Sequence, residues 1–328
     1  MSDPKPKVAF YWCSSCGGCE ESILDLAEDI LKVVAAVDIV YWPVALDFKK
    51  KDLEAMPDGS IAVAFINGSI RMSEQEEMAH LLRRKAQLVV AHGACAHLGG
   101  IPGLANFWNK ETIFRTVYHT TVSTANPDGV EPQLETVLDG KTLTLPKFWD
   151  TVHPLNDVID VDYYLPGCAP HRDLIMNAVT AILEGKLPPK GSVLAPNTSC
   201  CDECSRNKTK PEKMVIKEIK RPYEVILDPE KCFLAQGLIC MGPATRSGCK
   251  TRCINGNWPC TGCLGPGPNV IDQGAKMISA ISSILKVDEE KNLTEAQVQE
   301  LVDKIKDPVG TFYMYGLASS LLQRKRRA

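Results

Sequence analysis

The stretch VAFYWCSSCGGCEES, residues 8–22, decides the fold of this chain. Residues 8–12 are a short apolar run that predicts a buried strand. The loop after them holds three cysteines and the pair Gly17-Gly18, and residues 20–34 then carry apolar side chains at helical spacing. A strand that passes through a tight loop into a helix is the repeating element of an α/β fold. The apolar positions of the predicted helix are Ile23, Leu24, Ala27, Ile30, Leu31 and Val34.

Three further apolar runs, rich in β-branched residues, predict additional strands at 37–42, 61–66 and 87–93. Before the last of these, Ser73 is placed to cap a helix that runs to about Lys85, and Glu76 would complete a capping box. Strands that alternate with helices favour a mostly parallel sheet with helices on both faces.

The chain then changes character. Asp139-Gly140 lies between two alternating segments within 133–145 and predicts a β-hairpin. Residues 160–168 predict a late strand that runs into a loop, and 173–183 predict a helix that ends at Gly185. These elements complete an α/β domain over residues 1–192.

Residues 193–268 are poor in periodicity, rich in glycine and proline, and hold nine of the 14 cysteines. Such a segment predicts a loop-built domain whose folding depends on bound metal. Residues 269–286 and 294–306 predict helices, the second with a capping box of Thr294 and Gln297. We therefore expect a C-terminal helical segment over 269–328.

Composition narrows the class of protein. There are 37 basic and 40 acidic residues, a formal net charge of −3, which gives no electrostatic reason to expect a nucleic-acid partner. No apolar stretch approaches the ~20 residues of a membrane helix, and we find no secretion signal, so we expect a cytoplasmic chain that does not enter a membrane. In a reducing compartment, clustered cysteines bind metal or do redox chemistry more often than they form disulfides.

Four cysteines follow predicted strands. Cys16 and Cys19 come after the first strand, Cys95 after the fourth and Cys168 after the late one. Ligands of open α/β sheets bind outside the carboxyl ends of the strands, and a 4Fe–4S cluster needs four thiolates. Taken alone, Cys95 or Cys168 is better explained as a small buried apolar residue, and it is the matching position of Cys16 and Cys19 that favours a shared cluster. Cys13 is also placed to be a ligand, as Cys13-Ser-Ser-Cys16, although we favour the glycine-flanked pair.

The second region contains two possible sets of four. One set is Cys201, Cys204, Cys232 and Cys240, and the other is Cys249, Cys253, Cys260 and Cys263. Zinc is the competing metal, because two Cys-x-x-Cys pairs also make a closed tetrahedral site. Three closed zinc sites would provide no chemistry, whereas clusters in series make an electron path. Cys13 and Cys200 are left over by this grouping.

Five motifs carry a family resemblance: SCGGCEES (15–22), HGACAHLGGIPGLAN (92–106), LPGCAPH (165–171), CMGPATRSGC (240–249) and NWPCTGC (257–263). Together they resemble the small subunit of a nickel–iron hydrogenase, of the cytoplasmic methyl-viologen-reducing type that works with heterodisulfide reductase. The resemblance implies a flavodoxin-like, doubly wound parallel sheet, followed by a loop-rich iron–sulfur domain.

The same resemblance implies three 4Fe–4S clusters. The proximal ligands would be Cys16, Cys19, Cys95 and Cys168, the medial ligands Cys249, Cys253, Cys260 and Cys263, and the distal ligands Cys201, Cys204, Cys232 and Cys240. Well-known periplasmic relatives have a histidine in the distal set and a proline in the medial set. Here Cys201 and Cys253 stand in those places, so we expect cysteine ligands throughout.

The resemblance also implies partners. The nickel–iron centre would belong to a large subunit, and electrons would leave to a small 2Fe–2S subunit and heterodisulfide reductase. We weigh two alternatives: a cluster-bearing subunit of a quinone-reductase-like complex, which needs no second cysteine region, and a zinc-bearing structural protein. His92, His97 and His171 flank the proximal cysteines, and we expect them to be hydrogen-bond donors or interface residues and not ligands.

Overall fold

A five-stranded parallel sheet forms the centre of the computed structural model, which describes residues 4–285 and 293–323. Its strands lie in the order β2-β1-β3-β5-β9. This is the flavodoxin-like order, in which β2 lies on one side of β1 and the later strands β3, β5 and β9 lie on the other. The order in which strands are added therefore changes side between β1 and β3. The predicted doubly wound α/β fold is confirmed. The strands are β1 (Lys7–Trp12), β2 (Asp38–Tyr41), β3 (Ile61–Asn67), β5 (Ala86–His92) and β9 (Tyr163–Leu165).

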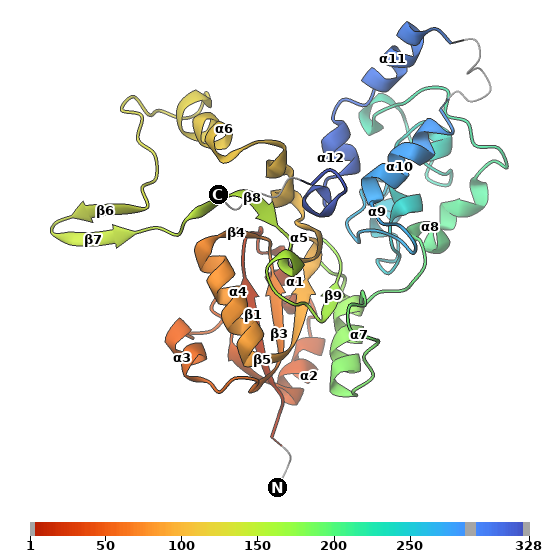
Figure 1. Cartoon of the computed structure of the whole chain (residues 1–328). Helices are drawn as coiled ribbons and strands as arrows, with labels where there is room; N and C mark the ends of the chain where they lie inside the picture. Colours follow the sequence, from red (N-terminus) through yellow and green to blue (C-terminus); the bar gives the residue numbers. More distant parts are fainter. Residues whose placement is uncertain (1–3, 286–292, 324–328) are drawn as a thin grey trace.

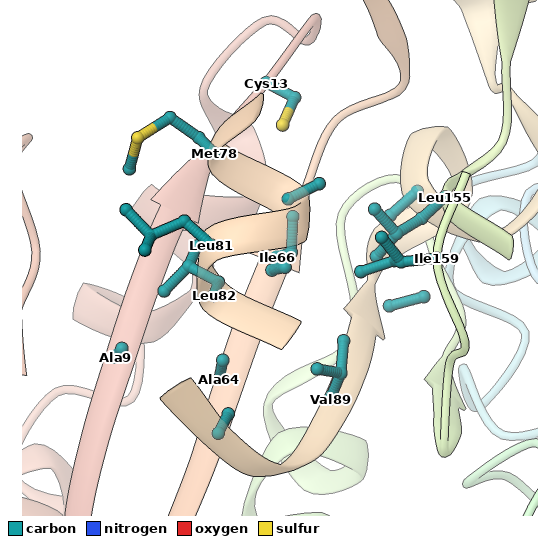
Figure 2. Close-up of a cluster of buried hydrophobic side chains, with 14 of the residues drawn as sticks. Ala9, Cys13, Ala64, Ile66, Met78, Leu81, Leu82, Val89, Leu155 and Ile159 are labelled. Atoms are coloured by element: carbon teal, nitrogen blue, oxygen red, sulfur yellow. The ribbon is translucent and has the colours of Figure 1, made fainter. Parts of the chain in front are cut away.

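Helices cover both faces of the sheet. Successive residues of a strand point to opposite faces, so each strand places apolar side chains under both layers of helices. Val8 and Phe10 pack in the apolar cluster that includes residues of α1 (Gly18–Leu24), α2 (Asp29–Ala36) and α7 (Arg172–Leu183). Ala9 packs on the other face, under α3 (Lys50–Ala55) and α4 (Ser73–Lys85). Figure 2 shows Met78, Leu81 and Leu82 of α4 over Ala64 and Ile66 of the sheet.

The single helix predicted over residues 20–34 is wrong. The chain forms α1 and α2 with a turn between them, and Ala27 in that turn has a left-handed φ of 51°. The break changes the helical phase, so the buried apolar residues are Ile23, Leu26 and Val33, while Leu24 and Leu31 are exposed. Apolar spacing does not reveal a single left-handed residue, because one residue hardly changes the pattern around it.

Helix α4 has the predicted bounds but not the predicted cap. Ser73 is its first residue, and the Ser73 Oγ accepts the N–H of Lys147 at 2.9 Å. The N–H of Met72 is bound instead by Oε1 of Gln75, at 3.1 Å. The capping box predicted at Thr294 is confirmed, because Thr294 N–H donates to Gln297 Oε1 at 2.9 Å and Thr294 Oγ1 accepts the N–H of Gln297 at 3.4 Å.

Between β5 and β9 the chain leaves the sheet and returns. The predicted hairpin is confirmed, with Asp139 and Gly140 both at positive φ in its turn, and it extends away from the rest of the molecule (Figure 1). The returning strand β8 pairs antiparallel with β4, a small sheet that the sequence pattern did not predict. The elements here are β4 (Ile70–Met72), α5 (Gly93–Leu98), η1 (Ile101–Phe107), α6 (Lys110–Arg115), β6 (Glu135–Leu138), β7 (Lys141–Thr144) and β8 (Phe148–His153).

The cysteine-rich region has little regular structure, as predicted. Most of its buried apolar residues form one cluster with those of the C-terminal helices, so Phe233 and Leu238 pack with Met277 and Phe312, whereas Leu264 packs with the sheet. The helix predicted over 269–286 is shorter, and the last residue of that range lies outside the described part. The boundaries at residues 192 and 268 stay a prediction. The helices are α8 (Cys200–Glu203), α9 (Arg252–Asn255), α10 (Gln273–Ser282), α11 (Glu295–Asp303) and α12 (Pro308–Phe312).

None of the helices in residues 4–285 and 293–323 is both long enough and apolar enough to cross a membrane.

Candidate metal centres

The four cysteines predicted to follow strands lie at one edge of the sheet. Cys16 and Cys19 are in the loop after β1 and the first turn of α1, Cys95 is in α5 directly after β5, and Cys168 follows β9. Because the strands are parallel, their carboxyl ends meet at this edge. The position is next to the point between β1 and β3 where the strand order reverses, the usual ligand site of this topology.

Close contacts link the loops that carry these thiols. An added Cβ on Gly93, at the start of α5, would lie 2.2 Å from the Sγ of Cys19. A Cβ on Gly100 would lie 2.5 Å from the Sγ of Cys95. The N–H of Ala94 donates to the carbonyl of Gly167 at 2.7 Å, which joins α5 to the Cys168 loop. The structure therefore brings all four predicted proximal cysteines together, in a space where glycine is needed beside two of the sulfurs.

A buried carboxyl group stabilises this edge through hydrogen bonds. The sequence pattern did not single it out. Glu20 follows Cys19, is 5% exposed, and accepts hydrogen bonds from Nε1 of Trp42 and Nδ2 of Asn67. Oδ1 of Asn67 in turn accepts the Ser15 hydroxyl at 3.0 Å. Burial raises the pKa of Glu20, while its two hydrogen bonds lower it. The network holds the cysteine loop against the end of β3.

The predicted distal set lies around one small cavity. Cys201, Cys204, Cys232 and Cys240 all line it. Lys210 lines the same cavity. Burial nevertheless raises the pKa of Cys201 to about 11, with Lys210 opposing the rise. The structure thus brings these four residues together with a cation at the edge of the cavity.

The predicted medial set lines a larger, more open pocket. Cys249, Cys253, Cys260 and Cys263 line it, together with Cys168 of the proximal set. Cys200, which spacing alone left without a place, lines it too. Burial raises the pKa of Cys263 to about 12, as it does for Cys95 at the proximal edge.

Short contacts join the three groups in series. Cys168 of the proximal group lines the same pocket as Cys263 and the other medial cysteines, which links the proximal and medial groups. The N–H of Met241 donates to the carbonyl of Cys260 at 2.9 Å, and a Cβ added to Gly242 would lie 3.6 Å from the Sγ of Cys240 and 4.0 Å from the Cβ of Cys260, which links the medial and distal groups. Residues of one group thus lie against residues of the next.

Of the histidines near the proximal edge, His92 and His171 are buried and His97 is partly buried. The ring of His97 stacks on Tyr164, with centroids 4.7 Å apart. Nδ1 of His171 accepts the N–H of Asp173 at 3.2 Å and caps α7. Nε2 of His92 has no hydrogen-bond partner among the described residues, and burial lowers the pKa of His92 to about 4. The structure gives His171 a capping role, places His92 in the core and leaves His97 partly buried against Tyr164.

Within residues 4–285 and 293–323, no group of three or more histidine, cysteine, aspartate or glutamate side chains forms a site for a single metal ion. A cubane keeps its four thiolates around the outside of an iron–sulfide core. The donors here fit that group: all are cysteines, none of them is in a disulfide, and the N–H of Gly18 donates to the sulfur of Cys16 at 3.5 Å. The three ligand sets stay predictions.

Comparison with known proteins agrees with this architecture. The family of the NADH ubiquinone oxidoreductase, 20 Kd subunit, matches residues 16–182. The iron-sulfur subunit of an F420-non-reducing hydrogenase from Archaeoglobus profundus is 40% identical over 97% of this chain and 98% of its own length. The corresponding F420-non-reducing hydrogenase subunit from Methanothermobacter thermautotrophicus is 39% identical over 98% of this chain and 97% of its own length.

The fold recurs in a solved structure. A chain of the recombinant [NiFeSe] hydrogenase of Desulfovibrio vulgaris Hildenborough superposes with a TM-score of 0.51 at 18% identity, over 81% of this chain and 95% of that chain. At that identity the likeness concerns the fold alone. The family match ends before the second cysteine region, whereas the F420-non-reducing hydrogenase relatives extend across it. The chain belongs to the NADH ubiquinone oxidoreductase 20 Kd subunit family and, within it, to the iron–sulfur subunits of F420-non-reducing hydrogenases, so it is a component of an oxidoreductase complex.

Proposed function

We propose that this chain is the electron-transfer small subunit of a nickel–iron hydrogenase and that it relays electrons through three 4Fe–4S clusters. The observation that carries the proposal is the serial arrangement of three cysteine groups, in which Cys168 shares a pocket with the medial cysteines and Gly242 lies between Cys240 and Cys260. A chain that only needed structural metal would have no use for such an order.

Each group of four would hold one cluster, and a bound cluster would supply reversible one-electron exchange. The proximal ligands are Cys16, Cys19, Cys95 and Cys168; the medial ligands are Cys249, Cys253, Cys260 and Cys263; the distal ligands are Cys201, Cys204, Cys232 and Cys240. The other contributions come from residues of this chain. The N–H of Gly18 donates to the sulfur of Cys16, and such a bond stabilises a thiolate in surroundings where burial alone favours neutral thiols. Insertion of the clusters should release protons, because the cysteines bind iron as thiolates.

The nickel–iron centre would belong to a large subunit bound at the proximal edge. We place that interface near Cys16–Glu21 and His97–Asn106. Ile101 is 50% exposed there, and Phe107 and Trp108 beside it are more than half exposed. Contiguous exposed apolar side chains around a functional site are typical of a surface that another subunit covers.

At the distal end we place the electron exit. The stretch 206–221 follows the Cys201–Cys204 pair and is rich in lysine and arginine, with only two acidic residues. Lys208, Lys213 and Lys217 in it are exposed. A basic surface suits an acidic electron carrier. We assign this surface to a small 2Fe–2S subunit and, through it, to heterodisulfide reductase.

The cytoplasmic location is part of the same proposal. It rests on the 14 free cysteines, which a reducing compartment keeps as thiols for cluster assembly. No observation favours the quinone-reductase-like or the zinc-bearing alternative over the hydrogenase subunit.

The test is purification of the native complex under anaerobic conditions, with metal analysis of each separated subunit. Three 4Fe–4S clusters require about 12 iron and no nickel on this chain, with nickel on a large partner. About four iron with two zinc would contradict the three-cluster proposal, and so would a stable monomer that oxidises hydrogen by itself.

A further inference from the structure

The hairpin of β6 and β7 has one apolar face and one polar face. Residues directly opposite each other in an antiparallel pair point to the same face, and successive residues of a strand alternate between faces. The strand register and the hydrogen bond from the N–H of Leu145 to the carbonyl of Leu134, at 3.0 Å, therefore assign each residue to a face. The apolar face, which we call the leucine face, holds Leu134, Thr136, Leu138, Lys141, Leu143 and Leu145. The polar face holds Glu135, Val137, Thr142 and Thr144.

The leucine face is exposed to solvent in this chain. Leu138 is 60% exposed and Leu143 is 48% exposed, with Leu134 and Leu145 between those values. A two-stranded hairpin without a layer packed against it is at best marginally stable in water. Contiguous exposed apolar side chains are typical of a surface that another chain covers. The amphipathic pattern therefore indicates a docking surface.

The base of the hairpin is held rigidly against the α/β domain. The N–H of Ser73 donates to the carbonyl of Lys147, and the N–H of Lys147 donates to the Oγ of Ser73, both at 2.9 Å. Further along β8, Nδ2 of Asn106 donates to the carbonyl of Val152 at 2.9 Å, and Oδ1 of Asn106 accepts the N–H of Val152 at 2.7 Å. The strand that leaves the hairpin is thus tied to both α4 and η1. A surface presented from a fixed base loses little freedom when a partner binds it.

Two observations indicate which partner covers the leucine face. Stable interfaces involve about 20–30 residues a side, so four leucines must belong to a larger surface. The chain enters this excursion from η1, where Phe107 and Trp108 are more than half exposed and their rings pack edge to face at 5.2 Å. Figure 1 shows the hairpin and the cysteine-rich region on opposite sides of the central sheet. The leucine face therefore continues the surface at the proximal edge and lies away from the distal electron exit.

We propose that the leucine face is a docking surface for the hydrogenase large subunit, so that the hairpin is an arm that extends the interface beyond the proximal edge. This inference rests on the proposed function, which places that subunit at the proximal edge. The arm holds no cluster ligand, because no cysteine occurs between Cys95 and Cys168. Lys141, next to the turn, is the charged residue of the face. The partner surface that fits it is an apolar groove with an acidic group at the end that receives the turn.

The experiment compares Leu138→Asp with Val137→Asp in the complete complex. The two residues are neighbours in β6 and are 60% and 67% exposed, but they point to opposite faces. A tag on this chain recovers the complex over a series of dilutions, and the large subunit and its nickel are measured per recovered chain. Leu138→Asp should weaken retention of the large subunit at least tenfold. Val137→Asp should match the parent, and both variants should keep about 12 iron.

Photo-crosslinking provides a second readout that does not depend on a destabilising change. A benzophenone amino acid at position 138 should crosslink to the large subunit, whereas the same group at position 137 should not. Equal retention of the large subunit by the two aspartate variants would overturn the inference. So would a crosslink from position 138 to a second copy of this chain or to the small 2Fe–2S subunit, or no crosslink at all. Failure of the proposed function would look different, since the parent itself would then purify without a nickel-bearing partner.

Discussion

Gly93→Ala should damage the proximal site far more than its size suggests. Gly93 has a φ of +86°, so any side chain there is strained, and its added Cβ would lie 2.2 Å from the Sγ of Cys19 and 3.4 Å from the carbonyl oxygen of Gly167. The left-handed backbone alone costs about 1–2 kcal/mol for a residue with a Cβ. Forcing a methyl group into a filled space adds about 1–3 kcal/mol. A free thiol would swing away, but a sulfur that holds a cluster corner has no freedom to move.

Gly191→Ala separates the two costs. Gly191 also has a φ of +86°, but a Cβ there would meet nothing within 4 Å. It lies near the amino end of β9, where its N–H donates to the carbonyl of Asp162, and Cys168 follows the carboxyl end of that strand. The control therefore carries the backbone strain without the collision.

The assay is iron content and thermal stability of the purified complex, with spectra of the individual clusters. We expect Gly191→Ala to keep about 12 iron per chain with a small fall in Tm. Gly93→Ala should lose about four iron, should lack the proximal signal, and should have a lower Tm than the control. Equal iron content and an equal fall in Tm in the two variants would refute the placement of Cys19 against Gly93.

Three further predictions concern other parts of the chain. Cys253→Pro should remove one iron from the medial cluster while the fold survives, so a three-iron signal should appear in electron paramagnetic resonance of the oxidised variant and not of the parent; an intact four-iron medial cluster would contradict the ligand set. Burial lowers the pKa of His92 to about 4 from an ordinary value of 6.5. As the pH falls below 6.5, the unfolded chain therefore binds a proton at His92 before the folded chain does. The contribution of neutral, buried His92 to the free energy of unfolding is complete above pH 6.5 and is lost toward pH 4. His92→Phe should reduce the fall in Tm between about pH 6.5 and 5.5 by the equivalent of about 1 kcal/mol; equal slopes in parent and His92→Phe would be evidence against this. Ile101→Asp should weaken co-purification with the large subunit at least tenfold without unfolding the chain, and Leu31→Asp, which is also exposed but lies on α2, should not; retention of the large subunit by Ile101→Asp would exclude this face as the interface.

The sheet was predictable because its signals are local. The apolar runs at residues 8–12, 61–66 and 87–93 are nearly continuous and not alternating, which is typical of strands buried on both faces. Each becomes a strand of the parallel sheet. The hairpin at Asp139-Gly140 was predictable for the same reason, since two residues decide its turn. The break at Ala27 was not, because it depends on one residue in a left-handed conformation.

The sequence by itself determined which cysteines follow strands, and parallel strands then require Cys16, Cys19, Cys95 and Cys168 to reach the same edge. Only the tertiary structure decided what surrounds them. Glu20 becomes a buried brace because Trp42 and Asn67 meet it from other parts of the chain. Gly100 donates its N–H to the carbonyl of Tyr315 at 3.0 Å, so the C-terminal segment packs on the Cys95 loop.

Cys200 is the clearest case. In the sequence it is an extra thiol beside a better-matched neighbour, and spacing gives no reason to associate it with Cys249 or Cys260, which are far along the chain. Spacing along a chain constrains neighbours only within a helix, a strand or a tight turn, because those have fixed repeats. Across an irregular region such as 193–268, which thiols meet depends on how the loops pack, and that is decided by the folded structure alone.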